Sequence, residues 1–144
     1  MTRSQAIRAW EALFRAQVAV MRSLTAEFSS KDISLNEYDV LFNLSRQPSH
    51  QLRLRDLNKQ LLLTQPSVSR LIDRLVARGY VWKTHDPADR RGALVGLTED
   101  GYELFRRTAV GHAASIAAHV GGALDERELN ELAALCNKLR QANT

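Results

Sequence analysis

Arginine and serine side chains recur, beside one glutamine, in the stretch LTQPSVSRLIDRLVARGY, residues 63–80. Its apolar residues repeat every three or four positions, which is typical of a helix with one buried face. The opposite face carries Ser67, Arg70, Asp73 and Arg74. Guanidinium groups bind phosphates and guanine edges, and hydroxyl and amide groups can also contact bases. The pattern of this helix alone therefore fits either a solvated face or a surface that binds something negatively charged.

Positive charge is concentrated in the middle of the chain. The 144 residues carry a net charge of +4, yet residues 53–91 alone hold nine Lys/Arg against four Asp/Glu, a local charge of +5. A basic segment between near-neutral flanks suits a polyanionic partner, although such charge also favours solubility. The sequence has no Gly-rich phosphate loop and no H-E-x-x-H motif. We therefore expect neither an enzyme nor a cofactor.

Turn and cap signals predict the elements that hold this polar face. Leucines mark a short helix over residues 54–61, and Thr64 caps a second helix that ends at Gly79. Two extended runs, VWKTH at 81–85 and ALVGL at 93–97, flank DPADRRG, whose composition predicts a hairpin tip. Two helices joined by a short turn and followed by a hairpin form a winged helix-turn-helix.

Long amphipathic helices are predicted on both sides of this region. Residues 4–29 keep their apolar side chains close to a seven-residue repeat, which suits packing against another helix. Capping signals start three more helices, at Ser34–Glu37, Thr98–Asp100 and Asp125–Glu128. The predicted fold class is mainly α with a small β-hairpin wing. Its regions are a winged helix-turn-helix DNA-binding domain, 34–98, and a helical dimerisation region, 1–33 and 99–144.

The segment DRRGALVGLT, residues 89–98, matches the D-x-R-x-x-x-x-x-L-T pattern of the MarR family of winged-helix transcription regulators. LTQPSVSRLIDRLVARGYV also resembles the recognition helix of that family and its exit into the wing, and the similarity covers essentially the whole chain. The resemblance implies a homodimeric, sequence-specific DNA-binding regulator of the repressor type. Its two recognition helices would enter successive major grooves of a near-palindromic double-stranded operator.

The resemblance also implies roles for individual residues. Arg91 would enter the minor groove from the wing tip, with its guanidinium held by the carboxylate of Asp89. Side chains of the recognition helix would face the major groove, and basic residues of the preceding helix would contact phosphates. The predicted DNA-binding set is Arg53, Arg55, Lys59, Thr64, Gln65, Pro66, Ser67, Ser69, Arg70, Arg74, Asp89, Arg90 and Arg91.

Two residues depart from the family pattern. Asn58 occupies a site where such regulators usually have a small alanine, and Trp82 stands where a basic residue is common. Asn58 could make a polar contact or alter the packing of its helix. Trp82 removes one expected phosphate contact and could anchor the wing from below.

Similar regulators release DNA when a small, often aromatic or phenolic, ligand binds between the dimer helices and the winged domain. The candidates here are Trp10, Phe14 and Tyr38, which would serve equally well as core residues. Two alternatives stay open: a winged-helix protein-interaction module without DNA binding, and a repressor that senses metal or redox state.

The sequence gives the sensing alternative little support. His112 and His119 share a helix face but have no acidic or cysteine partner between them, so no metal site is expected. Cys136, the single cysteine, lies on an apolar helix face and is expected to be an inert packed thiol. One cysteine, no apolar run long enough for a membrane span and a start without a secretory signal together predict a cytoplasmic protein.

Overall fold

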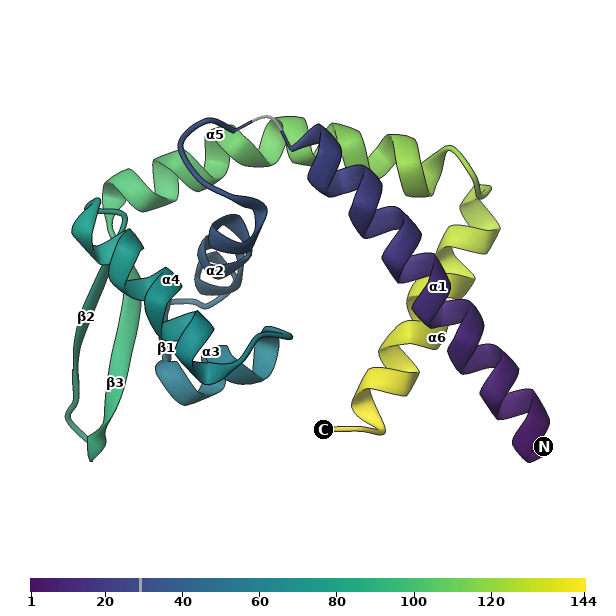
Figure 1. Ribbon diagram of the computed structural model, residues 1–144, viewed down its shortest axis with the longest axis horizontal. Helices are drawn as coiled ribbons and strands as arrows, with labels where there is room; N and C mark the ends of the chain where they lie inside the picture. Colours follow the sequence, from purple (N-terminus) through teal and green to yellow (C-terminus); the bar gives the residue numbers. More distant parts are fainter. Residues whose placement is uncertain (29) are drawn as a thin grey trace. The chain divides into compact units, whose positions relative to one another are not determined.

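The computed structural model describes residues 1–28 and 30–144 (Figure 1). These residues form two compact units. One comprises Met1–Phe28 and Gly111–Thr144, and the other comprises the described residues from 30 to Val110. The assignment of DNA binding to 34–98 and of dimerisation to its flanks stays a prediction.

The central unit is a winged helix-turn-helix, mostly helical with one small antiparallel sheet. Its helices are α2 (Leu35–Ser45), α3 (Leu54–Gln60), α4 (Gln65–Ala77) and the first part of α5 (Glu99–Ile116). The strands β1 (Gln51–Arg53), β2 (Val81–Asp86) and β3 (Asp89–Leu97) pair in the order β1-β3-β2. The largest fully buried side chains are Val40, Leu41, Leu44, Leu57, Val68, Ile72, Leu75, Val95 and Leu104. All of them lie in this unit, so it has a core of its own.

Helix α4 forms as its sequence predicts. The hydroxyl of Thr64 accepts the backbone N–H of Ser67, and proline stands in the first turn, where no N–H partner is needed. At the other end Gly79 has a φ of +81°, a conformation that favours glycine after a helix. The apolar stripe faces the core, except that Val76 is 38% exposed at its edge.

The sheet is larger than the sequence predicts. The hairpin strands extend to Asp86 and begin again at Asp89, so only Pro87 and Ala88 form the turn. Most of the segment expected to be a loose tip is therefore paired strand. The third strand, β1, has only three residues, and it exists because Gln51, Leu52 and Arg53 pair with residues 94–96 of β3. Such a short strand has no alternating pattern of its own.

The other unit consists of α1 (Arg3–Glu27), the end of α5, a π-helical turn η1 (Ala117–Gly121) and α6 (Glu126–Gln141). Capping boxes at Thr2 and Asp125 begin α1 and α6. The sequence predicts a regular helix to about Val120, whereas the structure changes to π geometry after Ile116. None of the described helices combines the length and apolar character that a membrane span requires.

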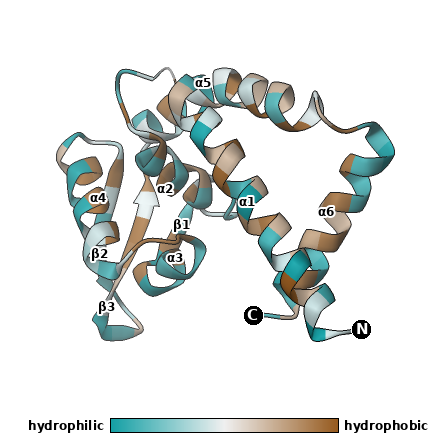
Figure 2. Cartoon of the chain, turned by 45° about the vertical axis from the view of Figure 1, so that its right-hand side comes forward, coloured by the Kyte–Doolittle hydropathy of each residue, from teal (hydrophilic) through white to brown (hydrophobic). Residues whose placement is uncertain are grey.

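Helices α1 and α6 leave much apolar surface uncovered. Figure 2 shows hydrophobic segments along both helices, and within α1, which is described in full, only Leu24 is buried. A groove of about 860 Å³ runs between α1 and α6. The large exposed apolar side chains of the two helices are Ile7, Trp10, Phe14, Val18, Met21, Leu132, Leu135 and Leu139.

Candidate nucleic-acid interface

The polar face of α4 begins with a small hydrogen-bond network in its first turn. The hydroxyl of Thr64 donates to Oγ of Ser67 at 2.9 Å, and Nη2 of Arg70 donates to the same oxygen at 3.3 Å. Arg70 is therefore held along the helix axis toward the N-terminal end. Gln65 and Arg74 lie exposed before and after it. These side chains are available to a ligand because the opposite stripe of α4 is buried.

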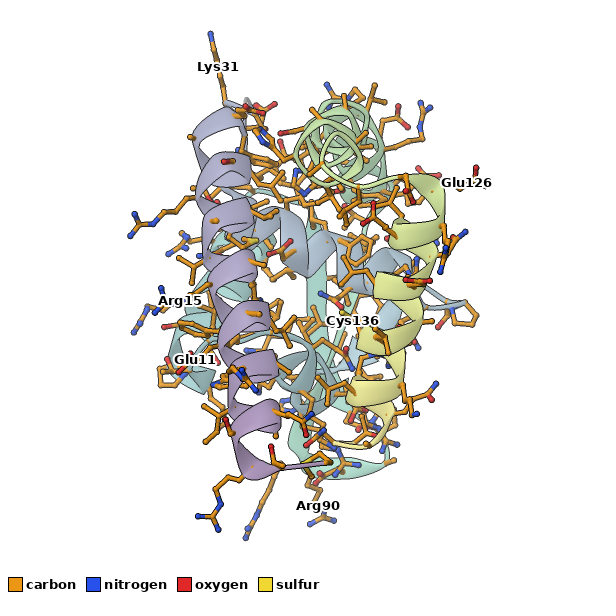
Figure 3. The ribbon with its side chains drawn as sticks, turned by 90° about the vertical axis from the view of Figure 1, so that its right-hand side faces the viewer. Glu11, Arg15, Lys31, Arg90, Glu126 and Cys136 are labelled. Atoms are coloured by element: carbon orange, nitrogen blue, oxygen red, sulfur yellow. The ribbon has the colours of Figure 1, made fainter. Side chains whose placement is uncertain are left out.

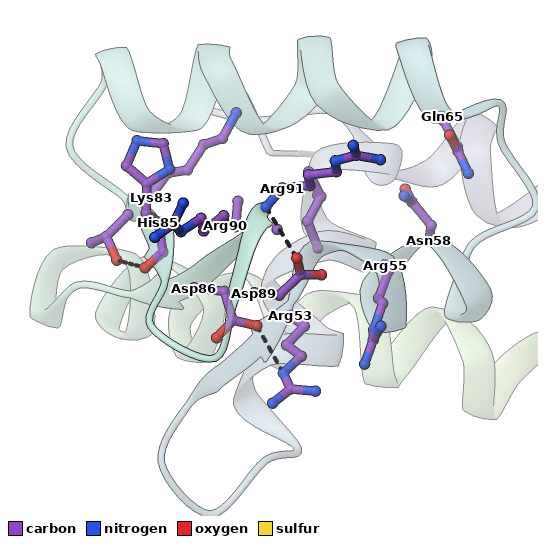
Figure 4. A pocket seen from close by; sticks show the side chains of 14 residues that line it. Arg53, Arg55, Asn58, Gln65, Lys83, His85, Asp86, Asp89, Arg90 and Arg91 are labelled. Atoms are coloured by element: carbon purple, nitrogen blue, oxygen red, sulfur yellow. Dashed lines mark hydrogen bonds and ion pairs between the residues drawn. The ribbon is translucent and has the colours of Figure 1, made fainter.

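A buried carboxylate holds the base of the wing. The side chain of Asp86 is only 4% exposed, and its Oδ2 lies 2.9 Å from Nε of Arg53. Its Oδ1 accepts the backbone N–H of Ala88 at 2.9 Å, which closes the hairpin turn. Arg53 thus joins β1 to the wing and keeps 41% of its side chain exposed. The single Asp86 carboxylate fixes both the turn and the cation beside it (Figure 4).

The Asp89 carboxylate binds a different group from the one the sequence predicts. Its Oδ1 accepts the backbone N–H of Arg91 at 3.0 Å, and no ion pair joins it to the Arg91 guanidinium within residues 1–28 and 30–144. The expected side-chain pair is therefore wrong for this conformation. A short Asp side chain readily reaches the N–H two residues ahead, which is the usual geometry of an Asx turn. Asp89 shapes the wing backbone while the side chain of Arg91 stays exposed.

A cationic cleft lies between α3, the start of α4 and the wing, with a volume of about 620 Å³. Figure 4 shows its side chains converging from these three elements. Its carboxylates belong to Asp86 and Asp89, which accept the internal hydrogen bonds described above. Its cations outnumber them: Arg53, Arg55, Lys83, Arg90 and Arg91. A concave surface with this excess of positive charge attracts the phosphates of a nucleic acid.

Comparison with known proteins identifies the family of this chain. A model of the MarR family matches residues 31–92. The HTH-type transcriptional regulator YhbI of Bacillus subtilis is 30% identical over 128 residues, which is 89% of this chain and 79% of that protein. The chain belongs to the MarR family. It spans between about half and two thirds of the length of several other curated regulators.

Solved structures agree with this assignment over nearly the whole MarR-family chain. AbsC, a MarR family transcriptional regulator from Streptomyces coelicolor, is 25% identical with a TM-score of 0.79, and the match covers 99% of this chain and 95% of AbsC. BpsR of Bordetella bronchiseptica is 28% identical with a TM-score of 0.78, over 92% of this chain and 98% of BpsR. The DNA binding of BpsR is regulated by 6-hydroxynicotinic acid. These relatives are transcriptional regulators, and the chain is a MarR-family transcriptional regulator.

The structure brings about half of the predicted DNA-binding residues of this MarR-family chain into the cleft. These are Arg53, Arg55, Gln65, Asp89, Arg90 and Arg91. The others do not line it: Lys59, Thr64, Pro66, Ser67, Ser69, Arg70 and Arg74. Lys59 lies 3.8 Å from Asp56 on its own helix, and the remaining six belong to α4 or its cap. DNA contact by any of these residues stays a prediction.

Three titratable side chains of the cleft are not among the predicted residues: Lys83, His85 and Asp86. The alternation of a β-strand places residues 83 and 85 on the same face, which was the available signal for the first two. Lys83 Nζ also lies 3.8 Å from Asp73 of α4, so the wing and the recognition helix contact each other. Nothing local in the sequence indicates the burial of Asp86, because Arg53, its partner, is distant in the chain.

The three candidate ligand residues do not share one unit. Trp10 and Phe14 lie on α1, with ring centroids 5.7 Å apart and more than half of each side chain exposed. Tyr38 is buried in the central unit, where its ring stacks on Phe105 at 5.5 Å. Tyr38 therefore has a packing role in the core. Ligand binding by these residues stays a prediction.

His119 lies in the π turn η1, and His112 lies earlier, in α5. His119 Nε2 is 2.7 Å from Oε1 of Glu27, and the hydroxyl of Ser115 donates to Oε2 at 2.6 Å. The bond from Ser115, followed by that with His119, lowers the pKa of the Glu27 carboxyl. No cluster of three or more metal-ligating side chains occurs among the described residues. Cys136 lies half-buried on the side of α6 that borders the groove with α1 (Figure 3).

Proposed function

We propose that this chain acts as a homodimeric, sequence-specific DNA-binding repressor. The cationic cleft beside the exposed polar face of α4 carries the proposal. In a winged helix-turn-helix, the recognition helix enters the major groove and the hairpin approaches the neighbouring backbone and minor groove. Arg91 is an exposed guanidinium near the wing tip, and a narrow minor groove attracts such a group electrostatically.

The recognition helix would supply the base contacts. Gln65 can bind adenine through two hydrogen bonds, and Arg70 and Arg74 can bind guanine or phosphate. Arg55 and the outer nitrogens of Arg53 would contact phosphates. This division assigns sequence preference to α4 and sequence-independent affinity to α3 and the wing.

The exposed apolar face of α1 and α6 supports a homodimer. Trp10 is 61% exposed and Leu135 is 66% exposed, and both belong to helices that leave a long apolar surface open. A second copy of the same face would remove this surface from water, which favours association. A two-fold dimer would place two recognition helices about 34–36 Å apart, so the operator would be a near-palindrome.

A duplex-binding assay at several salt concentrations tests the DNA contacts. Arg91→Ala is expected to weaken binding. It should also reduce the slope of log affinity against log salt concentration by about 0.9 or less, the value for one phosphate contact. Arg107→Ala removes an arginine that is also exposed but does not line the cleft, so it serves as the matched control. Equal affinity of the Arg91→Ala variant and the wild type at moderate salt would contradict the proposal. A protein-interaction module would bind no duplex even at low salt.

The oligomeric state is tested by light scattering on purified protein. Leu135→Glu places a charge on the open face of α6 and is expected to shift the protein toward monomer. Leu62→Glu makes the same change at a leucine that is 97% exposed in the turn before α4, and the dimer should persist. A wild-type chain that is monomeric at every concentration would contradict the dimer.

Release by a small aromatic ligand is part of the same proposal. It rests on the likeness to BpsR and on the aromatic candidates Trp10, Phe14 and Tyr38, and 6-hydroxynicotinic acid is a suitable first probe. Such a ligand would act by stabilising a dimer whose recognition helices are wrongly spaced. Titration of the repressor–duplex complex with the probe measures release directly. We propose the cytoplasm as the compartment, because the regulated DNA is there.

A further inference from the structure

Asn58 of α3 carries a polar atom without a partner at the edge of the cationic cleft. Its side-chain oxygen Oδ1 is fully buried and accepts no hydrogen bond from the described residues. Asn58 and Gln65 both line the cleft. A buried carbonyl oxygen without a donor costs stability, so such atoms are rare in folded proteins and each one calls for an explanation.

Three side chains of the cleft could donate to this oxygen. Figure 4 shows Arg55, on the same helix, directed away from Asn58. The guanidinium of Arg91 approaches from the wing. Gln65 is the first residue of α4, and its side chain points into the same end of the cleft as the Asn58 amide. Gln65 is exposed, and its side chain makes no hydrogen bond within the described part of the chain.

The chemistry of a glutamine amide makes Gln65 the suitable donor. An adenine in the major groove is bound through N6 and N7: the amide oxygen accepts from N6, and one N–H donates to N7. Both contacts use the edge of the amide that holds Oε1. The nitrogen Nε2 has a second N–H, which points away from the base and needs another acceptor. Oδ1 of Asn58 can be that acceptor.

We propose that Asn58 is a positioning residue for base recognition. Its Oδ1 accepts the outward N–H of Gln65 and thereby fixes the plane of the Gln65 amide against an adenine of the operator. The buried oxygen obtains its missing donor in the same step. The contact therefore breaks no existing hydrogen bond of Asn58 Oδ1. This inference rests on the proposed DNA-binding function and names which residue pair supplies one element of its specificity.

The experiment uses a duplex selected by the wild-type protein from a random pool and variants of it with single base pairs changed. Gln65→Ala is expected to lose the preference for one A·T pair by about five- to 150-fold. Asn58→Ala should lose preference at the same pair, and the double variant should lose no more than either single one. Asn58→Asp keeps an acceptor oxygen and should retain the preference, with weaker binding to all duplexes because of its charge.

A thermal melt of each variant separates positioning from a structural role. Asn58→Ala removes no existing hydrogen bond of Oδ1, so its melting temperature should not fall. The inference is overturned if Asn58→Ala keeps the full base preference, or loses it at a pair that Gln65→Ala leaves unchanged. The inference is also overturned if Asn58→Ala loses base preference at a base pair that Arg91→Ala affects and Gln65→Ala does not. That result would make Arg91 of the wing the donor to Asn58. A wild-type protein that selects no duplex would refute the proposed function itself, and with it the role of Asn58.

Discussion

Replacement of Arg53 by alanine tests whether the wing is held by its buried carboxylate. In the variant, Asp86 keeps the Ala88 N–H but loses the guanidinium at 2.9 Å. Breaking a fully buried ion pair costs about 3–5 kcal/mol, whereas an exposed pair contributes about 0–1 kcal/mol. Asp86 is 4% exposed and Arg53 is 41% exposed, so the pair lies between these limits. We expect the free energy of unfolding to fall by about 1–3 kcal/mol.

A double-mutant cycle isolates this interaction from other effects of the substitutions. Arg53→Ala, Asp86→Ala and the double variant are unfolded in urea at one protein concentration, because a dimer makes stability concentration-dependent. The coupling energy should be about 1–3 kcal/mol, since the two side chains are in direct contact. Additivity within about 0.5 kcal/mol would refute the reasoning, because it would mean that solvent replaces the pair without loss.

Three further predictions concern the same unit. The hydroxyl of Thr98 donates to the Gly79 carbonyl at 2.7 Å and accepts the Gly101 N–H at 3.0 Å, and Thr98→Val removes both bonds. Urea unfolding should show that the free energy of unfolding falls by about 1–2 kcal/mol. Thr98→Ser keeps the hydroxyl and should largely avoid this loss. Gly101→Ala would bring a methyl group against the backbone carbonyl of Tyr80, and its melting temperature should fall further than that of Thr98→Val. Burial raises the pKa of half-buried Asp39 to about 6, so the folded state keeps a proton that the unfolded chain releases. Stability should therefore fall as pH rises from about 4 to 6, and Asp39→Asn should remove that fall in melts across this range.

The helices could be predicted because their signals are local. Thr64, Ser34 and Asp125 each cap the helix that the sequence assigns to them, and the winged helix-turn-helix fold is confirmed. Cap and stripe patterns depend on residues three or four positions apart, which are adjacent in the sequence as well as in space. The same locality explains why Gly79 was correctly predicted at the end of α4.

The features that were missed depend on distant or directional contacts. Strand β1 exists because residues of β3, more than forty positions away, pair with it. The π turn η1 carries His119, whose contact with Glu27 joins residues 92 positions apart. The Asp89 carboxylate was assigned to the wrong group of Arg91, because the motif fixes the two residues but not whether the backbone or the guanidinium donates. Sequence spacing therefore identified the interacting residues more reliably than the interacting atoms.

The arrangement of acids explains how a surface rich in aspartate can still attract DNA. Asp86 binds Arg53 and the turn N–H, Asp89 binds a backbone N–H, and Asp73 lies near Lys83. These three carboxylates, which would otherwise repel a phosphate, thus shape or attach the wing. Arg53 and Lys83 each lie beside one of these carboxylates. We therefore expect the affinity of the cleft for DNA to depend most on Arg55, Arg90 and Arg91, which form no ion pair within the described residues. The sequence gives the net charge of the segment. The ion pairs and hydrogen bonds determine which of its cations remain available to a DNA duplex.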